Sequence, residues 1–373
     1  MEGRPQAVAW ENGASMTQEK KTVNVVPSVL EMFAMNIMCA VGLSEADAQT
    51  VAWALVAANL EGIDTHGVSR LALYARRVRA GLATARPNLR WSHPAPAVAL
   101  LDADNALGPV AATAAIDEAV RLAQVQGVGM VAVAHTNHAA AFSAYTERAA
   151  AAGCIALMGG NTPPAIPAWG GREAFLGTNP LAFSAPGPTR AEPAVVVDMA
   201  TSIVARGNII MAARQGQPIP EGWAIDAQGQ PTTDAQAALA GAVLPMAGAK
   251  GYALALMIEI LSAIVPGTSW GPQVRSPYDD WTKPTDAGLW CLAIYLGPLM
   301  SPEEYRTRLG GLLSALHETP AAPGQRVRIP GERRAEVRAV RSVEGIPIDS
   351  ATRSELDALS AEVRIAPLEW RES

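Results

Sequence analysis

The stretch at residues 127–140, GVGMVAVAHTNHAA, decides the fold class of this 373-residue chain. The run from Val128 to Ala134 is short, apolar and rich in valine, which is typical of a buried β-strand. Gly127 and Gly129 make the nearest approach in the chain to a Gly-x-Gly-x-x-Gly fingerprint, but they run into this strand. In a Rossmann fold the fingerprint follows a strand and opens a helix, and no P-loop motif occurs elsewhere. The sequence therefore excludes both of these nucleotide-binding elements.

Outward from this strand, the region from 83 to 300 alternates short apolar runs with alanine-rich helical segments. The expected strands cover 97–101, 128–134, 154–158, 194–197 and 289–295, and the expected helices cover 110–126 and 139–152. Turn signals such as Asn-Thr-Pro-Pro at 161–164 separate them. This alternation predicts an α+β domain with a mixed sheet. A longer apolar stretch, 252–265, is too short to span a bilayer, so we expect a buried helix there.

Both ends of the chain are helical in pattern. Within 22–82, apolar residues recur every three or four positions, Ser44 is expected as an N-cap, and 64–67 as a tight turn between two helices. Ser301-Pro-Glu-Glu predicts another helix start, and a further helix is expected after Asp349. We expect the helices of 301–373 to complete those of 22–82, as a discontinuous helical domain around the α+β domain. Residues 1–21 are expected to be a disordered tail.

Composition narrows the class of protein. Hydrophobic residues make up 49% and charged residues 17% of the chain, as in a globular protein. The net charge is −6 and no basic run appears, which argues against nucleic acid as a partner. The three cysteines lie far apart in apolar runs, and the polar N-terminus contains no apolar signal region. We therefore expect a cytoplasmic protein with no membrane partner.

The motif DTHGVSR at 64–70, followed by Tyr74, is the first candidate for chemistry. His66, Arg70 and Tyr74 are spaced by four, so on a helix they would lie along one face. That face offers a proton carrier, a cation that can bind a carboxylate through its fork, and a phenol. The alternative is that His66 caps a helix and Arg70 makes a surface ion pair, because polar faces with this spacing are common.

A second candidate pair, His135 and His138, follows the strand at 128–134 and precedes an alanine-rich helix. Such strand ends are favoured places for sites, because helix N-termini present unpaired N–H groups. We expect no metal, since no cluster of metal ligands has zinc-like spacing, and proton transfer is the better interpretation of these histidines. Several loops rich in small polar groups could hydrogen-bond sugar hydroxyls and phosphates, although each alone is more often an ordinary turn. They contain Asn161, Thr162, Thr178, Asn179, Asp198, Thr201, Lys250, Gly331 and Glu332.

Together these segments resemble the malate/L-lactate dehydrogenase family, which includes ureidoglycolate and sulfolactate dehydrogenases. The resemblance runs from about residue 23 to 363. Its marks are Asp64-Thr-His-Gly-Val-Ser-Arg, Asn137-His, Asn161-Thr-Pro-Pro, Leu176-Gly-Thr-Asn-Pro, Asp198-Met-Ala-Thr-Ser, Ala249-Lys-Gly-Tyr and Pro330-Gly-Glu. The resemblance implies an NAD(P)-binding α+β domain without Rossmann topology, a helical domain, and a homodimer with its active site between domains.

The resemblance also assigns roles to single residues. His66 and His138 fall on catalytic positions, and Thr65, Arg70 and Tyr74 on substrate-binding positions. The cofactor positions are Thr162, Asp198, Met199, Ala200, Lys250, Gly331 and Glu332. One departure is Ala140, where the family usually has glycine, and the segment Ser276-Pro-Tyr-Asp-Asp resembles the ureidoglycolate dehydrogenase branch.

The implied function is that of an NAD(P)-dependent oxidoreductase, transferring a hydride between nicotinamide and a small 2-hydroxy or 2-oxo acid. NAD is favoured over NADP on the hypothesis that Asp198 accepts hydrogen bonds from a ribose and repels a 2′-phosphate. Lys250 could serve a 2′-phosphate or the shared pyrophosphate. The alternatives are a reductase of a cyclic imino acid and, further away, a non-redox lyase or a ligand-binding relative.

Overall fold

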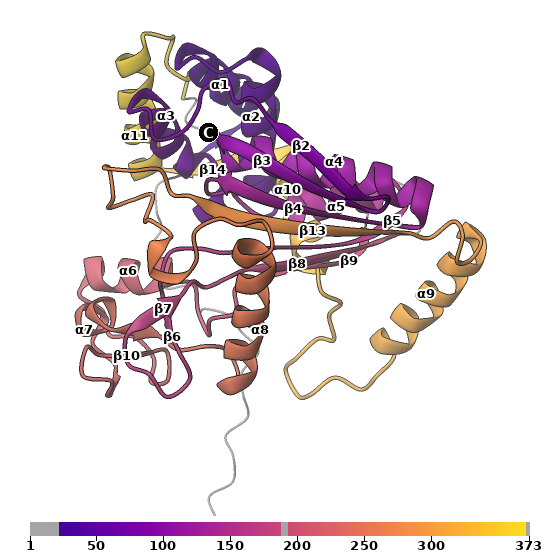
Figure 1. Ribbon diagram of the computed structural model, residues 1–373. Coiled ribbons are helices and arrows are strands. Elements are labelled where there is room, and N and C mark those ends of the chain that lie inside the picture. The colour runs from indigo at the N-terminus through magenta and orange to yellow at the C-terminus, as the bar shows by residue number, and fades with distance from the viewer. Residues whose placement is uncertain (1–21, 188–192, 371–373) are drawn as a thin grey trace, which may run out of the picture.

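The computed structural model describes residues 22–187 and 193–370, and within them seven strands form a central sheet (Figure 1). Their order is β2-β3-β4-β13-β5-β8-β9, with β3 and β4 as the parallel pair and the other neighbours antiparallel. The strands are β2 (Arg90–Ala95), β3 (Val98–Ala106), β4 (Val128–Thr136), β5 (Cys154–Gly160), β8 (Leu181–Pro186), β9 (Pro193–Met199) and β13 (Ala287–Tyr295). The predicted fold class, α+β with a mixed sheet, is confirmed.

The glycines of the opening motif serve the packing of helix on sheet. Helix α4 (Gly108–Gln126) ends at Gly127, whose φ of +84° lets the chain turn directly into β4. A Cβ atom at Gly129 would lie 2.1 Å from the carbonyl oxygen of Ala119, so only glycine lets α4 lie this close to β4. The second covering helix, α5 (Ser143–Ala151), contacts β5 and β8.

A helical layer built from both ends of the chain lies beside the sheet (Figure 1). Its short strands β1 and β14 pair antiparallel, and α10 and α11 contact α2 and α1, respectively. The elements are β1 (Thr22–Val25), α1 (Pro27–Ala40), α2 (Glu45–Leu60), the 3-10 turns η1 (Asp64–His66) and η2 (Val68–Arg70), α3 (Leu71–Arg79), α10 (Glu332–Glu344), β14 (Ile346–Asp349) and α11 (Ser350–Val363). The helical part is therefore discontinuous in sequence.

Helix α9 (Pro302–His317) departs from the predicted C-terminal helical unit. It projects beyond the end of the sheet in Figure 1, and the Tyr305 hydroxyl donates to the Pro186 carbonyl of β8 at 3.3 Å. None of its side chains is buried. The domain boundaries expected from the sequence remain a prediction, and residues 1–21 lie outside the described part.

A smaller region packs on a hydrophobic cluster of its own, which includes Ile166, Leu176, Ile209 and Val243. It contains the three-stranded sheet β11-β10-β12 and the pair β6-β7. Its elements are β6 (Ile166–Pro167), β7 (Ala174–Leu176), α6 (Arg206–Gln215), β10 (Ala224–Ile225), β11 (Pro231–Thr232), α7 (Ala235–Ala240), β12 (Ala242–Val243), α8 (Ala249–Glu259), the π-helical turn η3 (Ile260–Ile264) and the 3-10 turn η4 (Gly271–Gln273).

Helices begin directly after Ser44, Ser301 and Asp349, where the sequence predicts helix starts. Ser44 and Ser301 each accept a hydrogen bond from a first-turn N–H group, so these predicted N-caps are confirmed. The helix predicted after Asp349 is also confirmed, and the Asp349 side chain caps it. The helix expected at 252–265 is present as α8 and η3. The prediction that it is buried was wrong for one face, since α8 and η3 expose a row of large apolar side chains there. Among the described residues, no helix is long and apolar enough to cross a membrane.

Ala140 adopts the left-handed conformation, with φ at +56°. Its N–H points at Nδ1 of His138 across 3.4 Å, which ties this backbone turn to a candidate catalytic residue. A Cβ atom is strained at positive φ, and the turn delays the helix expected from 139 until Ser143. The glycine that the resemblance implies at this position would adopt the conformation without strain.

We predict that Ala140→Gly leaves the free energy of unfolding unchanged or raises it, although a buried methyl group is lost. Relief of the left-handed strain, roughly 1–2 kcal/mol, offsets that loss and the extra backbone entropy of glycine. Ala141, which is also buried and has no positive φ, is the matched control, and Ala141→Gly should lose about 1 kcal/mol. Urea unfolding measures both, and equal losses in the two variants would contradict the prediction.

Candidate active site

Asn59, near the end of α2, holds the turn that carries DTHGVSR through two side-chain hydrogen bonds. The Asn59 side chain donates to Oδ1 of Asp64 at 2.6 Å and accepts from the Val68 N–H at 2.8 Å. A Cβ atom at Gly67 would lie 2.1 Å from the Asn59 amide oxygen, so this position requires glycine. Arg341 of α10 pairs with Asp64 at 2.7 Å from the other side. The turn is therefore fixed by groups from both ends of the chain.

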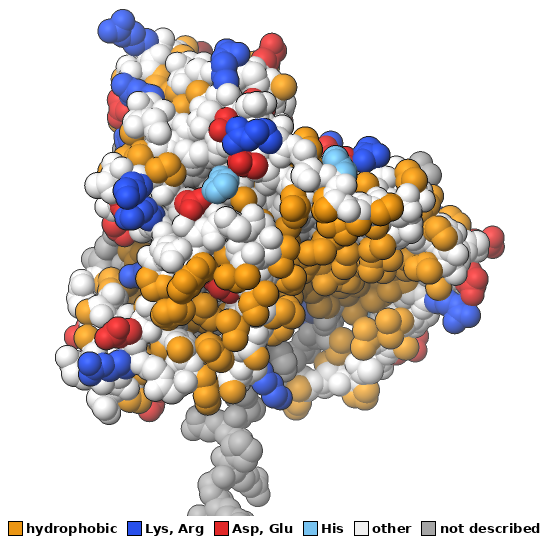
Figure 2. Space-filling view, viewed as in Figure 1, with side chains coloured by type: hydrophobic (Ala, Val, Ile, Leu, Met, Phe, Trp, Pro, Cys, Tyr) orange, Lys and Arg blue, Asp and Glu red, His pale blue; other side chains and the backbone are white. Residues whose placement is uncertain are grey.

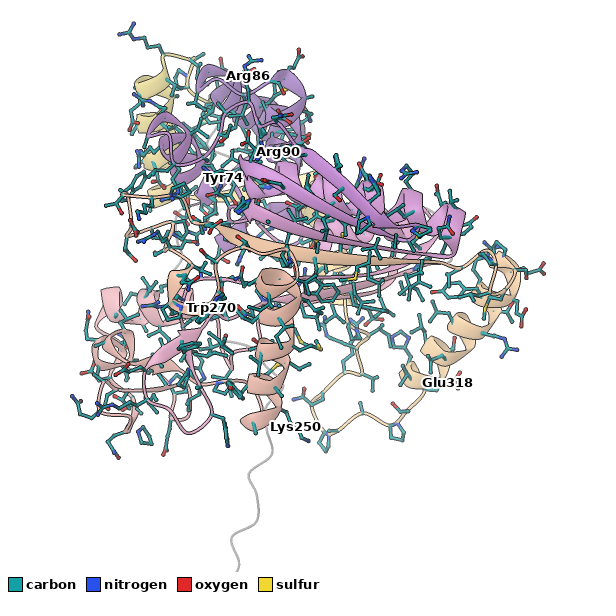
Figure 3. All side chains as sticks on the ribbon, in the orientation of Figure 1. Tyr74, Arg86, Arg90, Lys250, Trp270 and Glu318 are labelled. Carbon is teal, nitrogen blue, oxygen red and sulfur yellow. The ribbon has the colours of Figure 1, made fainter. Side chains whose placement is uncertain are left out.

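This turn and the end of β4 bring His66, Tyr74 and His138 together. The two imidazole rings stack with centroids 5.5 Å apart and planes 27° from parallel. The Tyr74 hydroxyl lies 2.7 Å from Nδ1 of His138, and Figure 3 labels Tyr74 where α3 meets the sheet. The His66 Nδ1 atom lies 3.0 Å from the hydroxyl of Thr65. Residues 64 apart in sequence thus form one hydrogen-bonded group.

Burial and nearby cations keep both histidines neutral. Burial, as the largest cause, together with the charges of Arg70 and Arg334 lowers the pKa of His66 to about 4. Burial also lowers the pKa of His138 well below its ordinary value, helped by His66 and Arg70. Burial raises the pKa of Tyr74, so this phenol keeps its proton. Because the Ala140 N–H also points at Nδ1 of His138, Tyr74 donates to that atom, and Nε2 carries the proton of the neutral ring.

Arg70 is a half-buried cation beside the two imidazoles. Its Nε donates to the Thr65 carbonyl at 2.6 Å, and its guanidinium lies 5.1 Å from the centroid of the Tyr278 ring. Its terminal nitrogens make no hydrogen bond within the part of the chain that the structure describes, so they can form a bidentate pair with a carboxylate. His135 lies apart from this group, since it is 45% exposed and bonds Asp102 at 3.1 Å.

The cofactor positions expected at 198–200 lie at the end of β9. The Asp198 carboxylate already accepts from the Ser143 N–H at 2.9 Å and lies 3.7 Å from Arg334. Burial raises the pKa of Asp198, while Arg334 and the Ser143 N–H act in the opposite direction. Met199 is exposed and Ala200 partly so. The charge of Asp198 is therefore matched within the protein.

Three other expected cofactor residues are buried and bonded to the protein itself. Asn161 bonds Glu259 and the Ser269 carbonyl, Asn179 bonds Glu259 and the Ala255 carbonyl, and the Thr201 hydroxyl bonds the Thr178 carbonyl. Their side chains have little or no surface that a ligand could touch. Their placement therefore does not support direct contact with a cofactor, and they hold the surrounding loops in place instead.

The remaining expected cofactor residues are more accessible. Thr162 and Thr178 are partly exposed, with their hydroxyls 3.4 Å apart. Lys250 is exposed in the first turn of α8, at the end of that helix distant from Tyr74 in Figure 3. Gly331, with φ at +105°, is the N-cap of α10, and Glu332 pairs with His317 at 2.6 Å.

Glu61 and its arginine partners form a buried charge cluster beside the candidate site, which the sequence did not predict. The Glu61 side chain is fully enclosed and pairs with Arg334 at 2.9 Å and with Arg338 at 2.6 Å. Arg338 also pairs with Glu147, whose pKa burial and Glu61 raise to about 7. The sequence contains a pattern that could have predicted this cluster, because the arginines at 334, 338 and 341 recur with the spacing of one helix face.

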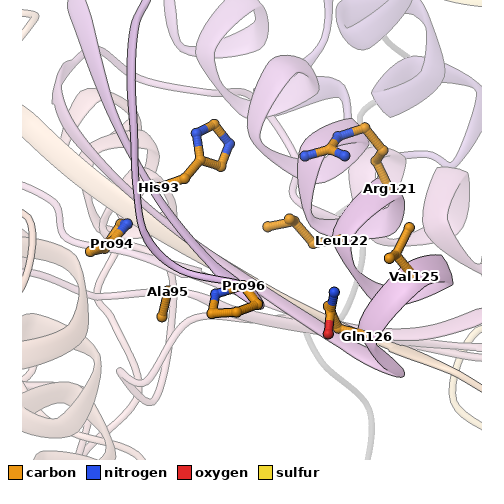
Figure 4. Close-up of a pocket in the computed structure, with 8 residues that line it drawn as sticks. All are labelled: His93, Pro94, Ala95, Pro96, Arg121, Leu122, Val125 and Gln126. Atoms are coloured by element: carbon orange, nitrogen blue, oxygen red, sulfur yellow. The ribbon is translucent and has the colours of Figure 1, made fainter.

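A cavity of about 500 Å³ between β2 and α4 lies outside this group. Figure 4 shows its lining, which combines apolar side chains such as Pro96 and Leu122 with His93 and Arg121. The His93 imidazole lies 2.7 Å from Glu118. The cavity contains none of the residues expected in the active site.

Comparison with known proteins identifies the family. The profile described as malate/L-lactate dehydrogenase matches residues 25–357. Ureidoglycolate dehydrogenase (NAD(+)) of Escherichia coli strain K12 is 38% identical, over 84% of this chain and 89% of its own length. (2R)-3-sulfolactate dehydrogenase (NADP(+)) of Chromohalobacter salexigens is 35% identical, over 88% of this chain and 95% of its own length. The sulfolactate dehydrogenase structure from Methanocaldococcus jannaschii matches with a TM-score of 0.85 and 33% identity, covering 92% and 98% of the two chains.

This chain belongs to the malate/L-lactate dehydrogenase family. It is an oxidoreductase of that family, and the family and enzyme class predicted from the sequence are confirmed.

We predict that Glu61→Gln lowers the free energy of unfolding by about 2–3 kcal/mol, because it leaves two arginines short of a buried counter-charge. Glu355→Gln is the matched control, since Glu355 pairs with Arg76 on the surface and its loss should change stability by about 0.5 kcal/mol or less. Chemical denaturation compares the two. A Glu61 variant as stable as the control would show that the buried cluster contributes no net stability.

Proposed function

We propose that this protein is an NAD(P)-dependent dehydrogenase of a small 2-hydroxy acid, or a reductase of the matching 2-oxo acid. The observation that carries the proposal is the pair of neutral imidazoles of His66 and His138 beside the fork of Arg70. A neutral imidazole can take the proton of an alcohol, and a guanidinium can hold the carboxylate on the neighbouring carbon. The names of the relatives support this substrate class.

The proton path follows from the hydrogen bonds. Because Tyr74 and the Ala140 N–H occupy Nδ1 of His138, the Nε2–H of this ring can donate a hydrogen bond to the substrate oxygen in both directions. His66 stacks beside it, and its low pKa leaves a ring nitrogen free to accept the hydroxyl proton during oxidation. The same ring, then protonated, returns that proton to the substrate oxygen during reduction. Arg70 fixes the substrate between them through its carboxylate. The nicotinamide, when bound, supplies the hydride acceptor or donor.

The proposed cofactor is NAD(H), with NADP(H) as the alternative. One relative is named for NAD(+) and another for NADP(+). Lys250 and the hydroxyls of Thr162 and Thr178 are the groups best suited to phosphate and ribose oxygens, because they are accessible donors. Arg334 beside Asp198 weakens the argument that this carboxylate repels a 2′-phosphate, so the preference for NAD(H) is modest.

We predict that His66→Asn and His138→Asn each lower kcat by at least about a hundredfold, since acid/base catalysis typically contributes roughly 10²–10⁴-fold. The assay follows nicotinamide absorbance with NAD(H) and NADP(H) on a panel of 2-hydroxy acids, 2-oxo acids and a cyclic imino acid. His93→Asn, in the cavity of Figure 4, is the control and should keep normal turnover. Normal turnover in both site variants would refute their proposed roles, and turnover with the cyclic imine alone would favour the alternative substrate.

We also propose a cytoplasmic homodimer. The three cysteines are free thiols, as expected in a reducing compartment. Figure 2 shows a broad apolar surface over α8 and toward α9, and large exposed apolar patches mark interfaces. Its exposed side chains include Leu256, Met257, Ile260, Ile264 and Val265 on α8 and the following turns, and Leu312 and Leu316 on α9.

We predict that light scattering gives twice the 38.9 kDa mass of one chain, and that Ile260→Glu shifts the protein toward the monomer. A charge in the buried centre of an interface is costly because it loses its water. Val125→Glu, on the exposed side of α4, adds the same charge elsewhere and should leave the mass unchanged. A monomeric parent protein would exclude the dimer.

A further inference from the structure

Of the three arginines of helix α3, Arg76, Arg77 and Arg79, only Arg77 is buried. Arg77 follows Arg70 and Tyr74 on the same helical face but is only 2% exposed. Its guanidinium donates to the carbonyls of Pro277 at 3.2 Å, Asp280 at 2.9 Å and Lys283 at 3.2 Å. It also lies 5.5 Å from the centroid of the Trp281 ring. One buried side chain thus fastens the whole 277–283 loop to the helix that presents the substrate-binding residues.

The loop is also braced internally, so its position is well determined. Asp280 accepts from Arg275 at 2.7 Å and from the Thr282 hydroxyl at 2.6 Å. These bonds hold the pKa of Asp280 below its ordinary range, with Thr282 as the largest cause. The Ser276 hydroxyl bonds Asp279 at 3.0 Å. The consequence is that Tyr278 is held with its ring over the guanidinium of Arg70.

Charge around the site is sparse. Within the described residues, the cations that act on His66, His138 and Tyr74 are Arg70 and Arg334. Arg334 is already matched by Glu61 at 2.9 Å and by Asp198 at 3.7 Å. Of these two cations, Arg70 is therefore the one without a carboxylate partner in the described structure. Its single positive charge can balance one substrate carboxylate.

Tyr278 lies beside the position where Arg70 would bind the substrate carboxylate. Its ring is 45% exposed and covers Arg70, so a substrate held by Arg70 would extend past an aromatic surface. The face of an aromatic ring carries partial negative charge and repels an anion. An uncharged side chain can pack against it at no such cost. A second carboxylate or a sulfonate would lose water without gaining a cation.

We propose that Tyr278, positioned by Arg77, restricts this enzyme to 2-hydroxy and 2-oxo acids with a single carboxylate and an uncharged side chain. This inference rests on the proposed function and names the substrate class within it. Tyr278 is a specificity-determining residue that acts through Arg70, and Arg77 is a positioning residue.

The test compares kcat/KM for acids with one negative charge, such as lactate, 2-hydroxybutyrate and ureidoglycolate, with values for malate and sulfolactate. We expect at least one singly charged acid to exceed both dianions by about tenfold or more, which corresponds to about 1.4 kcal/mol. A tenfold preference for malate or sulfolactate would overturn the inference and leave the proposed function standing. No nicotinamide-linked turnover with any member of the panel would instead overturn the proposed function.

Variants at position 278 separate selectivity from a general loss of structure. Tyr278→Phe keeps the ring and should keep the selectivity, whereas Tyr278→Lys places a second cation beside Arg70. The Lys variant should lower KM for malate relative to lactate by about tenfold, with kcat for malate changed much less. Val125→Lys, which adds the same charge on the exposed side of α4, is the control and should keep the parent ratio. Equal ratios in the two Lys variants would refute the role of Tyr278.

Discussion

The buried carboxylate of Glu61 is the constraint on which the rest of the structure depends. It lies just past the end of α2, where the helix dipole disfavours a negative charge, and it has no contact with water. Two arginines and the Ser143 hydroxyl compensate it. Arg334 and Arg338 come from α10, so this helix has to cross from the C-terminal part of the chain to the end of α2. The carbonyl of Asp198 accepts from Arg334 at 2.8 Å, which adds the end of β9 to the same cluster.

The candidate active site depends on that assembly. Because α2 and α10 are locked together, Asn59 and Arg341 can grip Asp64 from two sides and hold the turn that carries His66. The same cations that bind carboxylates also keep the imidazoles uncharged. Arg334 neutralises Glu61 and Asp198, and together with burial it lowers the pKa of His66. The charge of Arg334 therefore both stabilises the buried carboxylates and helps to keep His66 neutral.

The buried hydrophobic residues fall into two separate clusters, and this division leaves apolar faces of α8 and α9 exposed. The central sheet and helical layer share one large cluster of buried side chains, while the smaller region has its own. Helix α8 contributes Ala255 to the smaller cluster and turns Leu256 and Met257 outward. A helix that is apolar all round has two faces to cover, and the single chain covers one of them.

Local sequence determined the elements and the candidate chemistry, because those depend on neighbours a few residues apart. The caps at Ser44 and Ser301, the helix after Asp349 and the strand before His138 could all be predicted from local patterns. The spacing of His66, Arg70 and Tyr74 predicted one helix face, whereas the structure places these residues on η1, η2 and α3 in turn. The family followed from the order of short motifs. Only tertiary structure decided which residues meet: it enclosed Asn161 and Asn179, matched Asp198 with Arg334, and laid Tyr278 on Arg70. These contacts join residues tens to hundreds of positions apart, and burial and charge compensation depend on every group nearby in space, which local spacing does not specify.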